Sequence, residues 1–290
     1  MAPLQSEKKR PRTSGGNTRN SSNNNEDDVL PPAIVESRAS PVADAAASAV
    51  APAPQLIEPV LSEIPKLLLD LQKDNIQDVE SALDQLEELI STEKDDAEKK
   101  RQEENQREAS SLGANYAILS TMRKWQHAED VQCMACQSLR WLPNTLTTTL
   151  AIIDLGGLEA LVNALKLFPD SDPVQQTALD ALGCLFWDLE EKGNILMKKM
   201  CKHAERFVNE LGGIELTVKG MDKFPDHEDI QHEGCALLCA LSCLESIRKA
   251  MVKAGAARVV VAALEEHDSG SAESKRIQKN GKKCMQYLFA

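Results

Sequence analysis

The sequence contains few aromatic residues: Phe, Trp and Tyr together make up 3% of its 290 residues. Its hydrophobic share is nevertheless 42%, so a buried core must be built mainly from Leu, Val, Ile and Ala. No apolar run reaches the about 18 residues that a membrane-spanning helix needs, and residues 1–19 lack the apolar stretch of a signal peptide. The sequence therefore predicts neither a membrane span nor secretion.

Positive charge is also in deficit. The chain has 33 Lys and Arg residues against 45 Asp and Glu residues, which gives a formal net charge of −12. This balance argues against a general binder of nucleic acid or of anionic membranes. Because no secretory signal accompanies the eight cysteines, we expect reduced thiols in a cytoplasmic and/or nuclear protein.

The familiar motifs of catalysis are missing as well: the sequence has no Walker loop, GxGxxG, HExxH or GxSxG. The pair Cys133 and Cys136 has the spacing of a redox or zinc motif, but it lies in an expected long helix without a second such pair. The His and Cys residues between 232 and 243 share one helical side, yet the first and last would be about 16 Å apart, too far for one tetrahedral ion. We expect no enzyme, no cofactor and no metal site.

Residues 1–55 are rich in Ser, Asn, Ala, Pro and Gly and have few apolar anchors, which predicts a disordered N-terminal tail. The tail contains KKRPR, a basic cluster of the kind that nuclear import receptors bind. Its basic residues are Lys8, Lys9, Arg10 and Arg12. Two interpretations stay open: an import signal, or a chance cluster in a solvated tail.

From residue 56 onward, apolar residues recur at helical spacing and the sequence repeats itself. Four glycines each stand 12 positions before a turn. Successive copies begin 43, 56 and 43 residues apart, at Gly113, Gly156, Gly212 and Gly255. After each glycine an i, i+3, i+4, i+7 stripe predicts an amphipathic helix. Examples are Leu158, Leu161, Val162 and Leu165, and in the last copy Ala257, Val260, Val261 and Leu264.

A turn and a second amphipathic helix follow each stripe. The turns include FPDSDPVQ (residues 168–175) and FPDHEDIQ (residues 224–231), in which proline ends one helix and acidic residues suit the positive end of the next. The second helix repeats a small residue at one core position, which predicts close helix approach there: Ala135, Ala178, Gly234 and Gly281. With a shorter helix before each glycine corner, the unit has three helices.

This three-helix unit resembles the armadillo repeat. The resemblance rests on IRKAMVKAGA, LGGLEALVNALKLFPDSDPVQQTALDALGCL and LGGIELTVKGMDKFPDHEDIQHEGCALLCAL, and it covers about residues 56–290. It implies an all-α, right-handed solenoid of about five repeats whose third helices line a concave groove for extended peptides or partner domains. The expected repeats are a degenerate capping repeat at about 56–92, then 104–142, 146–188, 203–244 and 246–290.

One departure from the family pattern affects the expected ligand. Members that bind nuclear-localisation peptides carry an asparagine late in the third helix, whereas the matching positions of this chain hold Trp141, Cys184, Ala240 and Tyr287. That mode of peptide binding is therefore not expected.

Helical geometry predicts which side chains of the third helices face away from the core and toward the groove. The candidate partner-binding residues are Gln137, Trp141, Asp180, Trp187, His232, Lys279, Lys283 and Tyr287. Exposed Trp and Tyr side chains would anchor a peptide, and the two lysines would pair with an acidic ligand. The alternative is that Trp141 and Trp187 pack against neighbouring repeats.

Two segments interrupt the regular pattern. A 13-residue excess between the second and third clear copies falls near residues 189–203, and it is either an inserted loop or a lengthened first helix. The charged run at residues 91–108 is expected to be a solvated helix or loop.

Together these features predict a non-enzymatic scaffold or adaptor that binds a protein or peptide partner. Two alternatives stay open: a nuclear transport or targeting adaptor that uses its basic tail, and a thiol- or metal-dependent regulatory protein. The sequence itself names no particular partner and no oligomeric state.

Overall fold

The computed structural model describes residues 63–91, 96–187, 189 and 194–290. The predicted tail and its basic cluster lie outside the described residues. The described residues all belong to one compact unit. Among the helices that are described, none combines the length and the apolar character needed to cross a membrane.

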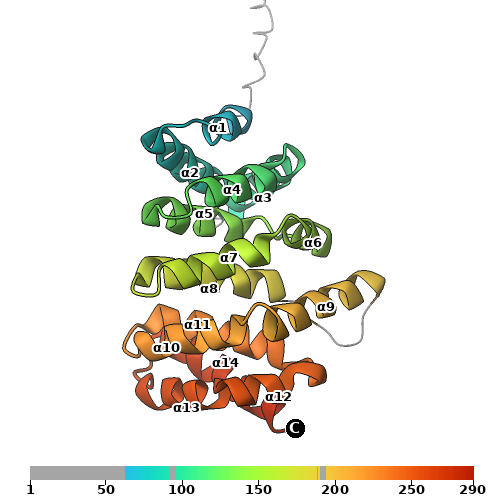
Figure 1. The fold of residues 1–290 in the computed structure, drawn as a ribbon, viewed down its shortest axis with the longest axis vertical. Helices are drawn as coiled ribbons and strands as arrows, with labels where there is room; N and C mark the ends of the chain where they lie inside the picture. The colour runs from blue at the N-terminus through green and yellow to red at the C-terminus, as the bar shows by residue number, and fades with distance from the viewer. Residues whose placement is uncertain (1–62, 92–95, 188, 190–193) are drawn as a thin grey trace, which may run out of the picture. The chain divides into compact units, whose positions relative to one another are not determined.

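The described residues form 14 α-helices and no β-strand (Figure 1). A pair of helices comes first, and four groups of three follow it. In chain order the helices are α1 (Ile64–Asp70), α2 (Ile76–Ile90), α3 (Asp96–Ser111), α4 (Ala114–Lys124), α5 (Glu129–Trp141), α6 (Leu146–Asp154), α7 (Gly157–Leu167), α8 (Asp172–Phe186), α9 (Ile195–Asn209), α10 (Gly213–Lys223), α11 (Glu228–Ser242), α12 (Glu245–Ala254), α13 (Ala256–Glu266) and α14 (Ala272–Leu288).

The groups stack in chain order, as Figure 1 shows. The long helices α2, α5, α8, α11 and α14 pack each on the next, and α4, α7, α10 and α13 form a second row beside them. One continuous cluster of buried apolar side chains runs through both rows. Because no unit can bury its own stripe, stacking creates the core. The predicted all-α solenoid is confirmed.

The corners between first and second helices need glycine. The backbone φ angles of Gly113, Gly156, Gly212 and Gly255 are 88°, 88°, 71° and 95°, in the left-handed region that side chains with a Cβ rarely adopt. In the third copy the next residue is constrained too, since a Cβ on Gly213 would overlap the ring of Phe207. The predicted glycine corners are therefore confirmed.

The predicted apolar stripes face the core, with one exception. Leu158, Leu161, Val162 and Leu165 are each at most 3% exposed. In contrast, Val261, the counterpart of Val162 in the last copy, is 38% exposed. In the preceding copy the equivalent residue, Val218, lies beside Gly255 of the following group, whereas within the described residues no helix group follows that of α13. The close approach predicted at Gly234 is confirmed: a Cβ there would lie 2.6 Å from the sulfur of Met221.

A glutamine at the start of each third helix ties that helix to the one before it. In every copy the side-chain Nε2 donates to two main-chain carbonyls near the end of the second helix, at 2.7–3.1 Å. Such carbonyls have no partner within their own helix. We call these residues the turn glutamines: Gln132, Gln175, Gln231 and Gln278. Gln175 and Gln231 are the last residues of the turn motifs FPDSDPVQ and FPDHEDIQ. The sequence analysis assigned them no role.

The 13-residue excess divides between a helix and a connection. Helix α9 has 15 residues, whereas its counterparts α6 and α12 have 9 and 10. Its first turns project beyond the stack at the right of Figure 1. The rest of the excess lies between residues 186 and 195, where residues 188 and 190–193 are outside the described part. The lengthened-helix interpretation therefore accounts for part of the insertion.

The charged run at residues 91–108 lies mainly in α3 and is not solvated on every side. Gln102 and Gln106 are 2% and 4% exposed, and Gln106 Nε2 donates to the carbonyl of Ile90 at 2.7 Å. Asn105 donates in the same way to Leu89 at 2.8 Å. The run forms a helix whose described charged side chains are exposed or half-buried, but one of its faces also packs on the chain, since Asn105 and Gln106 cap the end of α2.

Candidate groove on the third helices

Most of the predicted groove residues line one cavity. Six of the eight meet in a space of about 550 Å³ that crosses α8, α11 and α14. We call it the C-terminal groove, and its defining residues are Asp180, Trp187, His232, Lys279, Lys283 and Tyr287. The helical rows place them together because α8, α11 and α14 stack side by side.

The other two predicted residues lie elsewhere. Trp141 borders a separate cavity between α3 and α5. Its indole Nε1 donates to Glu87 Oε1 at 3.0 Å, and the Arg140 guanidinium lies 4.3 Å from the centre of its ring. Gln137 is half-buried on α5 and does not border the C-terminal groove. Trp141 thus packs against the neighbouring repeat, whereas Trp187 does not, since it is 79% exposed.

The acidic side chains of the C-terminal groove already have partners. Asp180 Oδ2 lies 2.6 Å from Arg140 Nη1, and Glu233 Oε1 lies 2.9 Å from His232 Nδ1. Burial, helped by the nearby Glu233 charge, raises the pKa of Asp180. Burial alone would lower the pKa of His232, but the hydrogen bond and the charge of Glu233 outweigh it and raise the pKa.

The basic side chains of the groove have no such partners. Arg276, Lys279 and Lys283 follow each other at helical spacing on α14, so they share one face. Within the described part of the chain, none of the three forms a hydrogen bond or ion pair with a carboxylate. The Nζ of Lys283 lies 5.7 Å from the ring centre of Tyr287, a cation–π contact. We call these three residues the basic wall.

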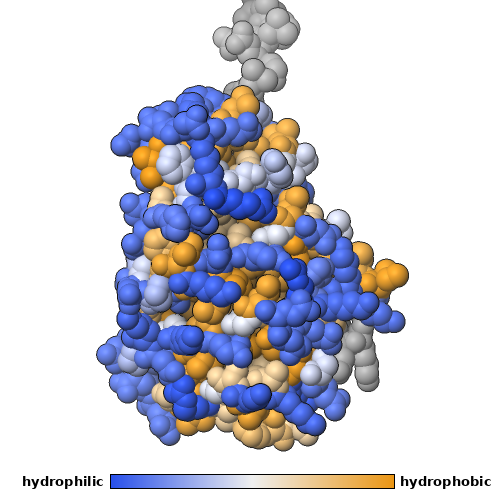
Figure 2. Space-filling view, viewed as in Figure 1, coloured by the Kyte–Doolittle hydropathy of each residue, from blue (hydrophilic) through white to orange (hydrophobic). Residues whose placement is uncertain are grey.

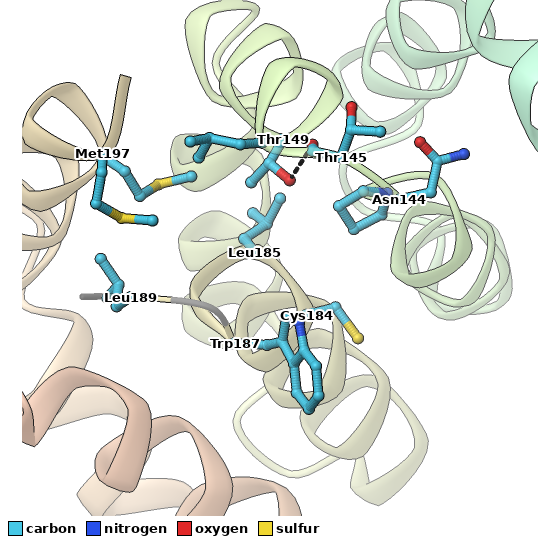
Figure 3. A pocket seen from close by; sticks show the side chains of 11 residues that line it. Asn144, Thr145, Thr149, Cys184, Leu185, Trp187, Leu189 and Met197 are labelled. Atoms are coloured by element: carbon cyan, nitrogen blue, oxygen red, sulfur yellow. Dashed lines mark hydrogen bonds between the residues drawn. The ribbon is translucent and has the colours of Figure 1, made fainter. Parts of the chain in front are cut away.

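Trp187 also borders a second, smaller cavity of about 130 Å³ (Figure 3). We call it the α9 pocket, and its apolar lining comes from Leu146, Leu185, Leu189, Met197 and Met200. In Figure 3, Leu185 and Thr149 point toward each other, with Met197 on one side. Thr149 Oγ1 donates to the carbonyl of Thr145 at 2.9 Å, so its hydroxyl is already satisfied. Cys184, Trp187 and Leu189 border both cavities.

Sequence reasoning missed Arg276, Met197 and Met200. Arg276 lies three residues before the first member of its row on α14, and extending the row by one helical turn would have included it. The two methionines lie in the insertion, where the repeat register is lost and no counterpart predicts their positions.

The opposite face of the stack has a different character. Figure 2 shows the side formed by α4, α7, α10 and α13, where hydrophilic residues predominate and hydrophobic ones are scattered. A hydrophobic group stands out at the projecting end of α9, where Ile195 is 81% exposed. Among the described residues, one cavity between α7 and α10 has a volume of about 270 Å³ and one between α4 and α7 about 80 Å³. Both are smaller than the C-terminal groove, at about 550 Å³.

The three most buried cysteines lack the features of reactive or metal-binding thiols. Cys136, Cys235 and Cys284 are fully buried, and burial raises the pKa of each thiol, to about 12 for Cys284. The thiolate is the reactive form and the metal ligand, so a raised pKa suppresses both roles. Within the residues that the structure describes, no group of three His, Cys, Asp or Glu side chains is arranged to hold a metal ion.

Comparisons with known proteins agree with the fold. A family model described as "LRRK2 ARM repeat" matches residues 111–290, more than half of the chain. A comparison with curated proteins finds no significant match. Among solved structures, two engineered proteins align with TM-scores of 0.54 and 0.58, at 19% and 21% identity. The first alignment covers 79% of this chain and 97% of the engineered one, and the second covers 78% and 48%.

A further structure is described as showing a phosphorylation switch that controls the interaction between cadherin and beta-catenin. It aligns at 17% identity with a TM-score of 0.42 and covers 78% of this chain and 45% of the other. At these identities, solved structures inform on the fold alone.

Proposed function

Because the chain belongs to the armadillo repeat family, matched as LRRK2 ARM repeat, we propose that it is a non-enzymatic interaction scaffold that binds an extended segment of a protein partner in the C-terminal groove. The observation that carries the proposal is the exposed indole of Trp187, which lines the same cavity as the basic wall. The functional part is the repeat region, proposed at residues 56–290.

The groove has the properties that a binding surface needs. Its residues stand on or directly after three stacked helices, so their backbone positions are set before a partner arrives. Tryptophan, tyrosine and arginine are enriched among residues that dominate binding energy. A large aromatic that is 79% exposed is unusual because such side chains are mostly buried, and burial by a partner would explain it.

Co-purification with the full chain tests this function. Proteins bound by the wild type are compared with those bound by Trp187→Ala, and Tyr116→Ala is the matched control. Tyr116 is 63% exposed on α4, outside the C-terminal groove. We expect Trp187→Ala to lose specific partners that Tyr116→Ala keeps, with unchanged circular dichroism in both. If Trp187→Ala keeps every partner of the wild type, the groove is not the binding surface.

The basic cluster KKRPR favours a second candidate function, an adaptor whose entry into the nucleus depends on its tail. The residues concerned are Lys8, Lys9, Arg10 and Arg12, outside the described part. Changing Lys9 and Arg10 to Ala in a tagged chain is expected to shift the protein toward the cytoplasm. An unchanged distribution would remove the cluster from consideration, whereas partner binding by the groove would be unaffected.

A further inference from the structure

We propose that the C-terminal groove selects an acidic segment carrying one large aliphatic side chain. The acidic residues of the ligand contact the basic wall, and the aliphatic side chain enters the α9 pocket beside Trp187. This inference rests on the function proposed above and specifies the chemistry of the partner.

The first support is the net positive charge of α14, which is opposite in sign to the charge of the whole chain. The chain as a whole has a formal charge of −12, yet α14 carries five Lys and Arg residues and the single acidic residue Glu273. Three of these cations form the basic wall, where no described carboxylate neutralises them. A groove with an excess of one charge attracts the opposite charge and speeds its association.

The carboxylates of the groove do not cancel this excess. Asp180 is held by Arg140, and Glu233 is held by His232. Their side chains are only 16% and 19% exposed. A basic ligand would have to displace these partners and approach the cations of α14. Electrostatics therefore favours an acidic segment over a basic one.

The second support is the α9 pocket, which the insertion creates. The added length of α9 places Met197 and Met200 opposite Leu185 at the end of α8. The resulting space of about 130 Å³ suits one aliphatic side chain, and methionines adapt readily to different shapes. Since the hydroxyl of Thr149 is already bonded to Thr145, it offers no free donor to a polar side chain.

The third support is continuity between the two cavities. Trp187, Cys184 and Leu189 border both, so one short segment can place its aliphatic residue in the α9 pocket while flanking residues lie along α14. Trp187 would cover the aliphatic side chain, and the ligand would bury the indole, which is 79% exposed.

A phage-displayed library of random peptides, selected on the purified full chain, tests the inference. We expect enriched peptides to contain several Asp or Glu residues next to one Leu, Ile, Met or Val. The affinity of an enriched peptide is then measured by fluorescence anisotropy. Binding should weaken as salt is added, because the contacts with the basic wall are exposed.

Matched variants locate the site. Lys279→Glu with Lys283→Glu is expected to weaken binding at least about tenfold, since two attractive contacts become repulsive. The control is Lys275→Glu with Lys282→Glu, which makes the same charge change on exposed positions of the same helix, outside the groove. Met197→Ser tests the pocket, and Leu69→Ser, at an exposed position of α1, is its control.

The outcomes separate the two proposals. Acidic peptides that lose affinity with the groove pair and Met197→Ser, but not with the controls, support the inference. Enrichment of basic or neutral peptides that Trp187→Ala no longer binds would overturn the acidic ligand and keep the groove as the binding surface. Peptides insensitive to every groove variant, or the absence of enriched peptides, would overturn both. Acidic peptides unaffected by Met197→Ser would overturn the role of the pocket.

Discussion

The side-chain amide of Gln175 donates to the main-chain carbonyl of Phe168 at 3.0 Å, and so joins the first turn of α8 to the end of α7. The same amide donates to Leu165 at 2.9 Å. Gln175 is 2% exposed, and its bond to Leu165 is buried whereas its bond to Phe168 is partly buried. The other turn glutamines repeat this arrangement, which ties the second helix to the third in each of the four three-helix groups.

Replacement of Gln175 by Ala should lower the free energy of unfolding by about 1–3 kcal/mol, because the buried carbonyl of Leu165 loses this donor and the carbonyl of Phe168 keeps only the N–H of Ser171. The adjacent Gln176→Ala is the matched control, since Gln176 is half-buried and its side chain forms no hydrogen bond within the described residues. Urea denaturation followed by circular dichroism measures both. Equal stability of the two variants would mean that the turn glutamines do not hold the helices together.

Two glycine substitutions should have opposite effects on stability. Gly213→Ala is expected to destabilise by about 1–3 kcal/mol, because its Cβ would overlap the buried ring of Phe207. Gly183→Ala should stabilise by up to about 1 kcal/mol, since Gly183 lies within α8 and a Cβ there meets no atom within 4 Å. Thermal unfolding compares the two. A destabilised Gly183→Ala would contradict the described environment of α8.

The buried thiols should resist alkylation in the native state. Burial raises the pKa of Cys284 to about 12 and raises those of Cys136 and Cys235 as well, so little thiolate forms at pH 8. We expect iodoacetamide to modify these three residues at least about a hundredfold faster in denaturant, as measured by peptide mass spectrometry. Rapid native modification of Cys284 would revive the thiol-dependent regulatory hypothesis.

The His232–Glu233 pair should contribute to stability at low pH. Burial opposes protonation of His232, but Glu233 raises its pKa above the ordinary 6.5, with smaller effects from Arg276 and Asp180. Since the folded pKa is raised, the contribution is fully present below about pH 6.5 and is lost as pH rises through the folded value. His232→Gln should therefore destabilise more at pH 5.5 than at pH 8.5.

The control for this pH dependence is His127→Gln, which removes an exposed histidine from the turn after α4. Urea midpoints at both pH values compare the two variants with the wild type. A His232→Gln effect that stays constant or grows with pH would show that the protonated pair is not formed.

Much of the fold could be predicted from the sequence because its signals are periodic. The stripe from Leu158 to Leu165 and the glycine corner at Gly156 each depend on local geometry, which the sequence records directly. The turn glutamines also recur at regular positions. Their burial does not follow from that pattern, because a polar residue in a helix ordinarily predicts a position on the surface. Val261 differs from the prediction because the exposure of this position depends on whether a following helix group covers it, and not on its own helix.

The sequence also predicted which residues lie next to each other in the groove for six of the eight candidates. Rows of residues spaced by helical turns placed Asp180, His232 and Lys279 in one cavity, because the third helices stack in register. Trp141 lies apart, because α3 and Arg140 surround it. The charge of α3 predicts a solvated helix, so its packing beside Trp141 does not follow from the sequence. The α9 pocket could not be predicted, because an insertion has no repeat with which to align.

The extension of α9 has a consequence for how such a protein can diversify. Each repeat contacts only its neighbours, and α8 still packs on α11 despite the longer helix between them in sequence. Residues 187–195 can therefore gain or lose length while the long helices keep their packing. A change in this segment would alter the lining of the α9 pocket, and with it the ligand side chain that we propose the pocket binds, at little cost to folding.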